Sequence, residues 1–301
     1  MEYKFNDKKL GTTFEIIIVE NEGKDKEIND NMFLIWKYID EFEQEFSRFR
    51  DNSQLTNLNN QKNLNVSRTF LDILAKSMNL YRFTNKYFNP LLNLKNLGYS
   101  HSFAENNFEI LLENQDLNLE EINIVGENIV LKENQNIDFG GIAKGYLVDK
   151  LDEKLSDFGY TNYLVNAGGD IYMKGLNNEN EKWVIGIENP YEQGYIGTVS
   201  LSDISISTSG SYKRHWKIKG EDYHHIVNPY TGKNENSLIG ITIISSKCYI
   251  SDSLATAIFS MGIDKGKEFM LNNGIDGILF GSNKSIFLTP NFTKKYTFTN
   301  L

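Results

Sequence analysis

Residues 137–145 read Ile-Asp-Phe-Gly-Gly-Ile-Ala-Lys-Gly and set two adjacent glycines between an apolar segment and a helical pattern. The helix is expected over residues 141–158, because Leu147, Leu151 and Leu155 share one face and Gly159 supplies a stop. A strand end that passes through Gly140 and Gly141 into a helix exposes backbone N–H groups, which suit a phosphate. A plain tight turn explains the glycines equally well, and their spacing before Lys144 is not that of a Walker A loop.

Strand and helix patterns alternate irregularly around this segment. The first strand is expected at residues 13–19, followed by a helix through residues 35–46 and a second helix capped by Ser67. Short strands and turns are expected over residues 108–131. Later strands are expected at residues 163–165, 183–187, 197–201 and 239–245, then a helix after Ser251 that ends at Gly262, and a hairpin over residues 277–288. Without a regular βαβ rhythm, the pattern predicts an α+β fold.

Composition narrows the classes of function. The chain has 301 residues, of which 40% are hydrophobic, so it can bury a large core as one domain spanning residues 1–301. A net charge of −9 argues against nucleic-acid binding but not against one phosphorylated cofactor. The single cysteine, Cys248, lies in an apolar run and is expected to be a buried strand residue. Oligomeric state is left open.

The N-terminal residues and the hydropathy pattern bear on location. No apolar stretch approaches the ~20 residues that span a bilayer, so no transmembrane segment is expected. The charged first residues lack a signal-peptide core, which predicts a cytoplasmic protein as the sequence stands. The alternative is an extracytoplasmic lipoprotein whose leader has been removed.

Two further segments combine glycine with polar residues. Residues 166–170, Asn-Ala-Gly-Gly-Asp, join two strands and are either an ordinary hairpin turn or a place where the backbone approaches a ligand. Residues 207–232 contain Ser-Thr-Ser-Gly, then His224 and His225, then Asn-Pro-Tyr-Thr-Gly. The histidines suit either acid–base work or an inert surface role, and the chain has too few His and Cys for a zinc site.

The fourth segment is Ser251-Asp252-Ser253-Leu254-Ala255-Thr256-Ala257. Asp252 and Thr256 are four residues apart, so in a helix they project from one face. A carboxylate and a hydroxyl are hard oxygen ligands suited to Mg²⁺. Alternatively, Asp252 merely complements the helix dipole.

Taken in order, these segments resemble the FAD:protein FMN transferase family, also described as ApbE-like flavin transferases. The matching elements are residues 11–14 (Gly-Thr-Thr-Phe), 46–49 (Phe-Ser-Arg-Phe) with Ser53, Leu55 and Asn59, 88–90 (Phe-Asn-Pro), 138–145, 166–170, 207–210, 225–232 and 252–256. This chain differs at Leu10, where the family usually has Met, and at Asn89, where it usually has Asp. Asn228, where the turn often has Asp, is a common alternative.

The resemblance implies a T-fold-like domain with mixed, mainly antiparallel sheets and flanking helices, which binds FAD in a cleft with Mg²⁺ on its pyrophosphate. It implies that Asp252, Thr256 and the backbone carbonyl of Ala143 hold the metal. Residues implied to contact FAD are Asn59, Gly140, Gly141, Lys144, Gly169, Asp170, Ser209, Gly210 and Thr231. His225 and Asp252 are the implied catalytic residues.

The implied reaction is transfer of FMN from FAD to a threonine of an acceptor flavoprotein, with release of AMP. By resemblance, the acceptor is expected to carry an Asp/Ser/Thr-rich motif. Two other functions fit the same residues. One is a Mg²⁺-dependent FAD pyrophosphatase that uses water in place of threonine, and the other is a non-catalytic flavin-binding protein.

Overall fold

The computed structural model describes residues 1–92, 115–211, 215–218 and 221–300. An eight-stranded sheet forms its centre, in the order β1-β2-β6-β7-β10-β13-β14-β15. Every neighbouring pair in this sheet is antiparallel. The strands are β1 (Glu2–Lys9), β2 (Thr12–Val19), β6 (Tyr163–Ala167), β7 (Asp170–Lys174), β10 (Ile204–Gly210), β13 (Leu238–Ser245), β14 (Asp276–Gly281) and β15 (Ile286–Leu288).

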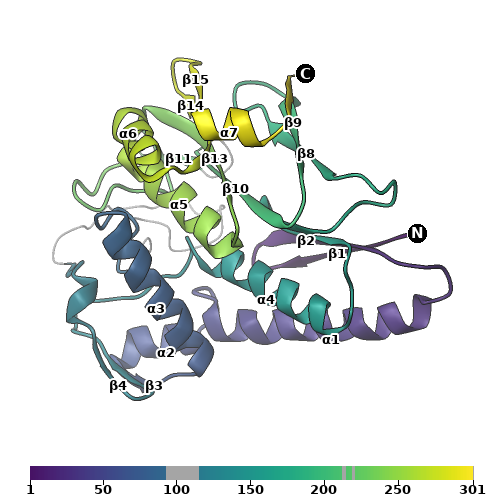
Figure 1. Cartoon of the computed structure of the whole chain (residues 1–301). Coiled ribbons are helices and arrows are strands. Elements are labelled where there is room, and N and C mark those ends of the chain that lie inside the picture. Colours follow the sequence, from purple (N-terminus) through teal and green to yellow (C-terminus); the bar gives the residue numbers. More distant parts are fainter. Residues whose placement is uncertain (93–114, 212–214, 219–220, 301) are drawn as a thin grey trace.

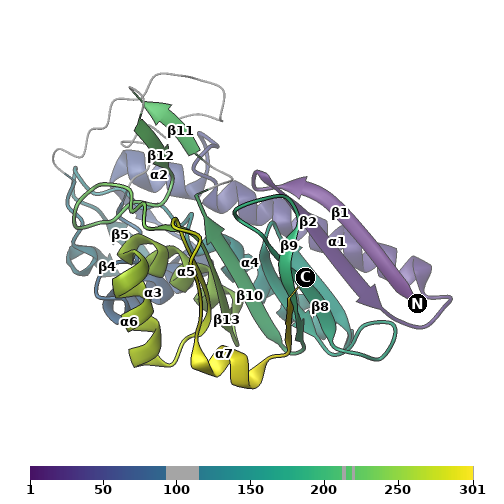
Figure 2. The same ribbon diagram turned by 90° about the horizontal axis from the view of Figure 1, so that it is seen from above.

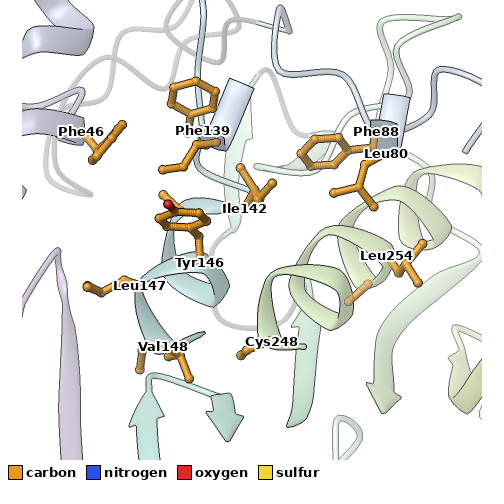
Figure 3. Packing of buried hydrophobic residues seen from close by; sticks show 14 of the residues in the cluster. Phe46, Leu80, Phe88, Phe139, Ile142, Tyr146, Leu147, Val148, Cys248 and Leu254 are labelled. Atoms are coloured by element: carbon orange, nitrogen blue, oxygen red, sulfur yellow. The ribbon is translucent and has the colours of Figure 1, made fainter. Parts of the chain in front are cut away.

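Helices cover one face of this sheet (Figure 1). They are α1 (Asp25–Phe46), α2 (Gln54–Gln61), α3 (Arg68–Phe83), α4 (Ala143–Asp157), α5 (Cys248–Met261) and α6 (Ile263–Asn273). Strand β2 turns Phe14, Ile16 and Ile18 into the core on this side, as the period of two along a strand requires. Figure 3 shows the part of this core at the start of α4, where Phe139 packs edge-on against Phe46 at 6.0 Å between ring centroids.

A second, smaller layer lies on the opposite face of the sheet (Figure 2). It consists of the three-stranded sheet β16-β9-β8 and of α7 (Pro290–Lys295), whose Phe292 is fully buried. The strands are β8 (Trp183–Glu188), β9 (Tyr195–Leu201) and β16 (Phe298–Asn300). This layer encloses a separate hydrophobic cluster, in which Trp183, Ile185 and Ile187 alternate with exposed or half-buried residues along β8.

The remaining strands lie outside these layers. One small sheet joins β3 (Asn63–Asn65), β5 (Asn128–Val130) and β4 (Asn123–Val125), and a hairpin joins β11 (His215–Ile218) and β12 (Glu221–His224). A short 3₁₀ turn, η2 (Leu119–Glu121), precedes β4.

The α+β class, the antiparallel sheets and most predicted elements are confirmed. Ser67 caps α3 by accepting a hydrogen bond from the Phe70 N–H, and Gly159 follows α4 with a positive φ of 89°. The predicted strands correspond to β2, β6, β8, β9 and β13, and the C-terminal hairpin to β14 and β15. Of the predicted short strands over residues 108–131, those at residues 108–114 lie outside the described residues.

Four predictions are wrong. The segment that leads into Gly140 is irregular backbone and not the end of a strand. The first strand of the chain is β1, not β2. Cys248 is buried as expected, but it begins a helix rather than lying in a strand. The helix predicted after Ser251 is α5, which starts three residues earlier. It can start there because the carboxylate of Asp149 on α4 accepts hydrogen bonds from the backbone N–H groups of Cys248 and Tyr249, both at 2.9 Å.

Gly145 allows α4 and α5 to approach closely. A Cβ atom on Gly145 would lie 2.4 Å from the carbonyl oxygen of Cys248 and 2.8 Å from Cβ of Asp252. The Gly145 N–H donates a hydrogen bond of 3.0 Å to Oδ2 of Asp252. Glycine at this position thus brings the starts of the two helices together and fixes the direction of one carboxylate.

Candidate active site

A cleft of about 970 Å³ opens where the starts of α4 and α5 meet the large sheet. Its residues come from distant parts of the sequence. At the helical end it is lined by Arg48, Phe88, Asp138, Gly140, Gly141, Lys144, Asp252 and Thr256. In the middle it is lined by Thr12, Gly168, Gly169, Thr208, Ser209, Gly210 and His225, and beyond them by residues of β1, β2, β6, β7 and β8.

Asp252 and Thr256 lie on one face of α5, as their spacing predicts, and both line the cleft. Asp252 is only 4% exposed, and its Oδ2 is oriented by the Gly145 N–H. Gly141 borders Thr256: a Cβ atom at Gly141 would lie 3.2 Å from the Thr256 hydroxyl oxygen. The turn before α4 therefore meets the second and third turns of α5 at these oxygen-bearing side chains.

Lys144 brings positive charge to the same place. Its ammonium group forms an ion pair with Asp170, a carboxylate that is 3% exposed, and lies 3.8 Å from Oδ1 of Asp252. Asp170 does not line the cleft, so it acts on the cleft through Lys144. The motifs at residues 138–145 and 166–170 thus meet through one partly buried ion pair.

The segment before α4 is held from three sides. The side chain of Asn59 binds both the N–H and the C=O of Ile137, at 2.7 and 2.8 Å. The Asp138 N–H donates to the carbonyl of Pro90 at 2.7 Å, and the Asp138 carboxylate pairs with Arg48. Asn59 does not line the cleft; it fixes the backbone that leads into the Gly-Gly turn. Arg48 and Asp138 border the cleft and belong to the sequence motifs, but sequence reasoning assigned them no role.

The two histidines have different environments. His224 is buried, and its Nδ1 accepts hydrogen bonds from the Ile226 N–H and the Asn234 amide, both at 3.2 Å. That arrangement places its proton on Nε2, which donates to the carbonyl of Glu235, and burial lowers the pKa of His224. His225 is half-buried and lines the cleft. The structure therefore separates a structural histidine from one that can reach a ligand.

The other predicted contacts fall on the turns and strand ends of the large sheet. Gly169 belongs to the β6–β7 turn and lines the cleft, with its N–H bound to the Asn166 side chain at 2.9 Å. Ser209 and Gly210 are the last residues of β10 and also line it. Thr231 lies in the turn after His225, where its N–H donates to the carbonyl of Asn228, and it does not line the cleft.

The donor set can be compared with the needs of Mg²⁺. In the part of the chain that the structure describes, no three His, Cys, Asp or Glu side chains converge into an all-protein metal site. One carboxylate and one hydroxyl at the edge of a cleft nevertheless fit Mg²⁺, which keeps water molecules and takes substrate phosphates as ligands. Ala143 does not line the cleft and Gly141 does, so Gly141 is the better placed to offer a backbone oxygen beside Thr256.

A separate observation concerns membranes. Among the helices of the described residues, none combines the length and the apolar character needed to cross a bilayer. This agrees with the hydropathy of the sequence.

Two solved structures share the fold. The ApbE protein of Thermotoga maritima superposes with a TM-score of 0.87 at 23% identity, covering 98% of this chain and 99% of that one. The flavin transferase ApbE of Vibrio cholerae gives a TM-score of 0.81 at 24% identity, with 98% and 99% covered.

Curated relatives extend the similarity to sequence. The FAD:protein FMN transferase of Vibrio cholerae is 29% identical over 279 residues, which cover 85% of this chain and 80% of that protein. The FAD:protein FMN transferase of Haemophilus influenzae is 26% identical over 320 residues, with 97% and 90% covered. A family model described as the ApbE family matches residues 10–279, and the chain therefore belongs to the ApbE family.

Proposed function

We propose that this protein transfers the FMN part of FAD to a threonine hydroxyl of an acceptor protein. The observation that carries the proposal is the convergence of Lys144, Asp252 and Thr256 on one cleft in a chain that belongs to the ApbE family. The two curated relatives that this chain matches over most of their own length are FAD:protein FMN transferases, and that activity is the one proposed here.

In this reaction a bond forms between the threonine oxygen and the FMN-side phosphorus of the pyrophosphate. The bond from that phosphorus to the bridging oxygen breaks, AMP leaves with the electron pair, and the threonine proton passes to a base. Bound Mg²⁺, held by Asp252, Thr256 and a backbone carbonyl, would neutralise charge on the pyrophosphate. Lys144 adds a fixed positive charge at the same end of the cleft, because Asp170 anchors its ammonium group.

His225 is the proposed proton acceptor. It lines the cleft, whereas His224 is buried and uses both ring nitrogens in hydrogen bonds. Imidazole is the side chain that most often accepts a proton in general base catalysis. Gly140 and Gly141 complete this end of the cleft, because a residue without a side chain leaves room for a phosphate.

The test compares Asp252→Asn with Asp264→Asn. Asp264 is a matched control, since it also lies near the start of a helix, α6, but is exposed. Each protein is incubated with FAD, Mg²⁺ and a synthetic peptide that carries the Asp/Ser/Thr-rich acceptor motif, and peptide mass is followed. Thermal stability with and without Mg²⁺ gives a second readout that does not depend on turnover.

Wild type and Asp264→Asn are expected to add FMN to the peptide and to gain stability with Mg²⁺. Asp252→Asn is expected to lose transfer by about a hundredfold or more, together with the gain from Mg²⁺. Free FMN and AMP with an unmodified peptide would indicate a pyrophosphatase instead, and intact FAD would indicate a binding protein. Undiminished transfer by Asp252→Asn would refute the assigned site.

A further inference from the structure

Among the residues that the structure describes, strand β8 has an open edge, which faces the cleft. It is the last strand of the sheet β16-β9-β8, and all six of its residues, Trp183–Glu188, line the cleft. Six residues of strand extend over about 20 Å. An unpaired strand edge is a ready template for another extended chain.

The hydrogen bonds of β9 reveal which β8 groups face outward. The Ser200 N–H donates to the carbonyl of Thr297, on the side away from β8. Ser200 lies opposite Val184 in the β8–β9 ladder, and the two residues therefore form a non-hydrogen-bonded pair. Val184 therefore points its N–H and C=O toward the open edge, and by alternation so does Gly186. Within the described residues, neither N–H has a recorded partner.

The floor beside this edge is apolar only in part, because polar side chains of β1, β2 and β6 also line the cleft; Ile17 is half-buried and Leu164 is buried. The large sheet extends past β8, and Ile17 on β2 pairs with Leu164 on β6 beneath the cleft. Strand β8 itself is anchored over β7, because Trp183 Nε1 donates to the carbonyl of Lys174 at 3.1 Å. A strand added to β8 would therefore lie over β2 and β6 and cover Ile17 and Leu164, which extends the smaller hydrophobic cluster.

The edge also leads to the reactive end of the cleft. The first residue of β8, Trp183, lies beside Lys174 at the end of β7 that points away from the Gly168–Gly169 turn. Its end, Glu188, comes two residues before Pro190, whose Cβ lies 3.7 Å from the position of a Cβ on Gly240. Gly240 pairs with Gly210, which lines the middle of the cleft. A chain laid along β8 would thus run toward Gly210 and the phosphate-facing residues.

We propose that the acceptor polypeptide docks by adding an extended strand to the edge of β8. This inference rests on the proposed function and names how its second substrate binds. The segment paired with β8 has small or apolar side chains at alternate positions, which face Ile17 and Leu164, and no proline opposite Val184 or Gly186. The hydroxyl that receives FMN follows at the Glu188 end.

The test removes one edge donor. Val184→Pro deletes the outward N–H and leaves the pairing with β9, because Val184 makes no ladder bond to β9; proline is tolerated at such edge positions. Val184→Thr is the matched control, since it keeps the N–H and the β-branched shape. The side chain of Val184 is 57% exposed, so neither change should disturb the core. FMN addition to the synthetic acceptor peptide is measured against peptide and FAD concentration.

Val184→Pro is expected to raise KM for the peptide roughly fivefold, the loss of about one hydrogen bond, while KM for FAD and the behaviour of Val184→Thr stay at wild-type values. An unchanged peptide KM in Val184→Pro would overturn the docking mode while leaving the transferase activity intact. A rise in KM for FAD alone would also overturn it, because the edge would then serve the nucleotide.

Hydrogen exchange of the wild-type protein tests the same point without a substitution or turnover. The peptide, added without FAD, is expected to slow exchange of the Val184 and Gly186 amides about tenfold or more. If these amides exchange at unchanged rates with saturating peptide, no strand is added and the proposal fails. Absence of FMN transfer by the wild type would instead count against the proposed function.

Discussion

Replacing Gly145 with alanine tests whether the contact between α4 and α5 positions the reactive residues. The added Cβ would lie 2.4 Å from the carbonyl oxygen of Cys248, which is 1.0 Å short of the 3.4 Å at which ordinary contact begins. The obstacle is backbone at the start of a helix, so the two helices must separate. Asp252, whose Cβ would be 2.8 Å away, moves with α5.

Two opposing free energies set the size of the effect on stability. Alanine gains about 1 kcal/mol over glycine in a helix. Forced overpacking costs about 1–3 kcal/mol, and a rigid backbone contact belongs at the upper end. The expected net result is a loss of about 1–2 kcal/mol in the free energy of unfolding. A displacement of about 1 Å at a reacting group costs on the order of a hundredfold in rate, so transfer should fall much further than stability does.

Gly266→Ala is the matched control for the assay. Gly266 also lies in a helix, and its added Cβ would crowd Ile258, with the γ2 methyl at 2.9 Å and the carbonyl oxygen at 3.2 Å, but it would not touch Asp252. Its free energy of unfolding in urea should therefore fall as well, while its rate of FMN transfer should stay near wild type. If Gly145→Ala keeps both stability and rate, the close approach of α4 and α5 has no role in holding Asp252.

Three further predictions follow from the same region. Burial raises the pKa of Asp149 to about 6 from an ordinary 3.8, so the native state holds this proton more tightly than the unfolded chain does. As the pH rises from about 4 to about 6, the free energy of unfolding of the wild type should therefore fall by on the order of 3 kcal/mol relative to that of Asp149→Asn in urea titrations. Parallel pH profiles of the two proteins would contradict this. Thr256→Val should weaken Mg²⁺ binding in calorimetry without unfolding the protein; unchanged affinity would remove Thr256 from the ligand set. Asp170→Asn frees Lys144 to move toward Asp252, so Mg²⁺ affinity should drop about tenfold, whereas an unaltered affinity would show that Asp170 has only a packing role.

Local signals in the sequence were sufficient for much of the fold. The N-cap at Ser67 and the glycine after α4 act within a few residues, and their effects are visible in the sequence alone. The start of α5 is different, because its N–H groups are bound by Asp149, which is 99 residues away from Cys248. Strand β1 was missed because it lies at the edge of the sheet and most of its residues are exposed or charged, so it lacks a clear apolar alternation.

The same distinction holds for the site. The motifs contain most of the residues that meet in the cleft, since Gly140, Lys144, Asp252 and Thr256 were all named from local patterns. The backbone position beside Thr256 depends on how the turn before α4 meets α5, and Gly141, which lines the cleft, lies there. The open edge of β8 has no signature in the sequence, because it depends on which strand the three-stranded sheet leaves unpaired.

The edges of the large sheet carry a consequence for aggregation. Strand β1 ends the sheet with the charged residues Glu2, Lys4, Asp7, Lys8 and Lys9, and charged side chains along an edge disfavour pairing with another strand. Strand β15, at the other end, has three residues and offers little length for pairing. Within the described part of the chain, neither charged side chains nor short length protects the β8 edge at Val184 and Gly186. A cell that makes this protein in excess of its acceptor leaves the β8 edge at Val184 and Gly186 available to any extended chain, so intermolecular pairing of partly unfolded chains should begin there.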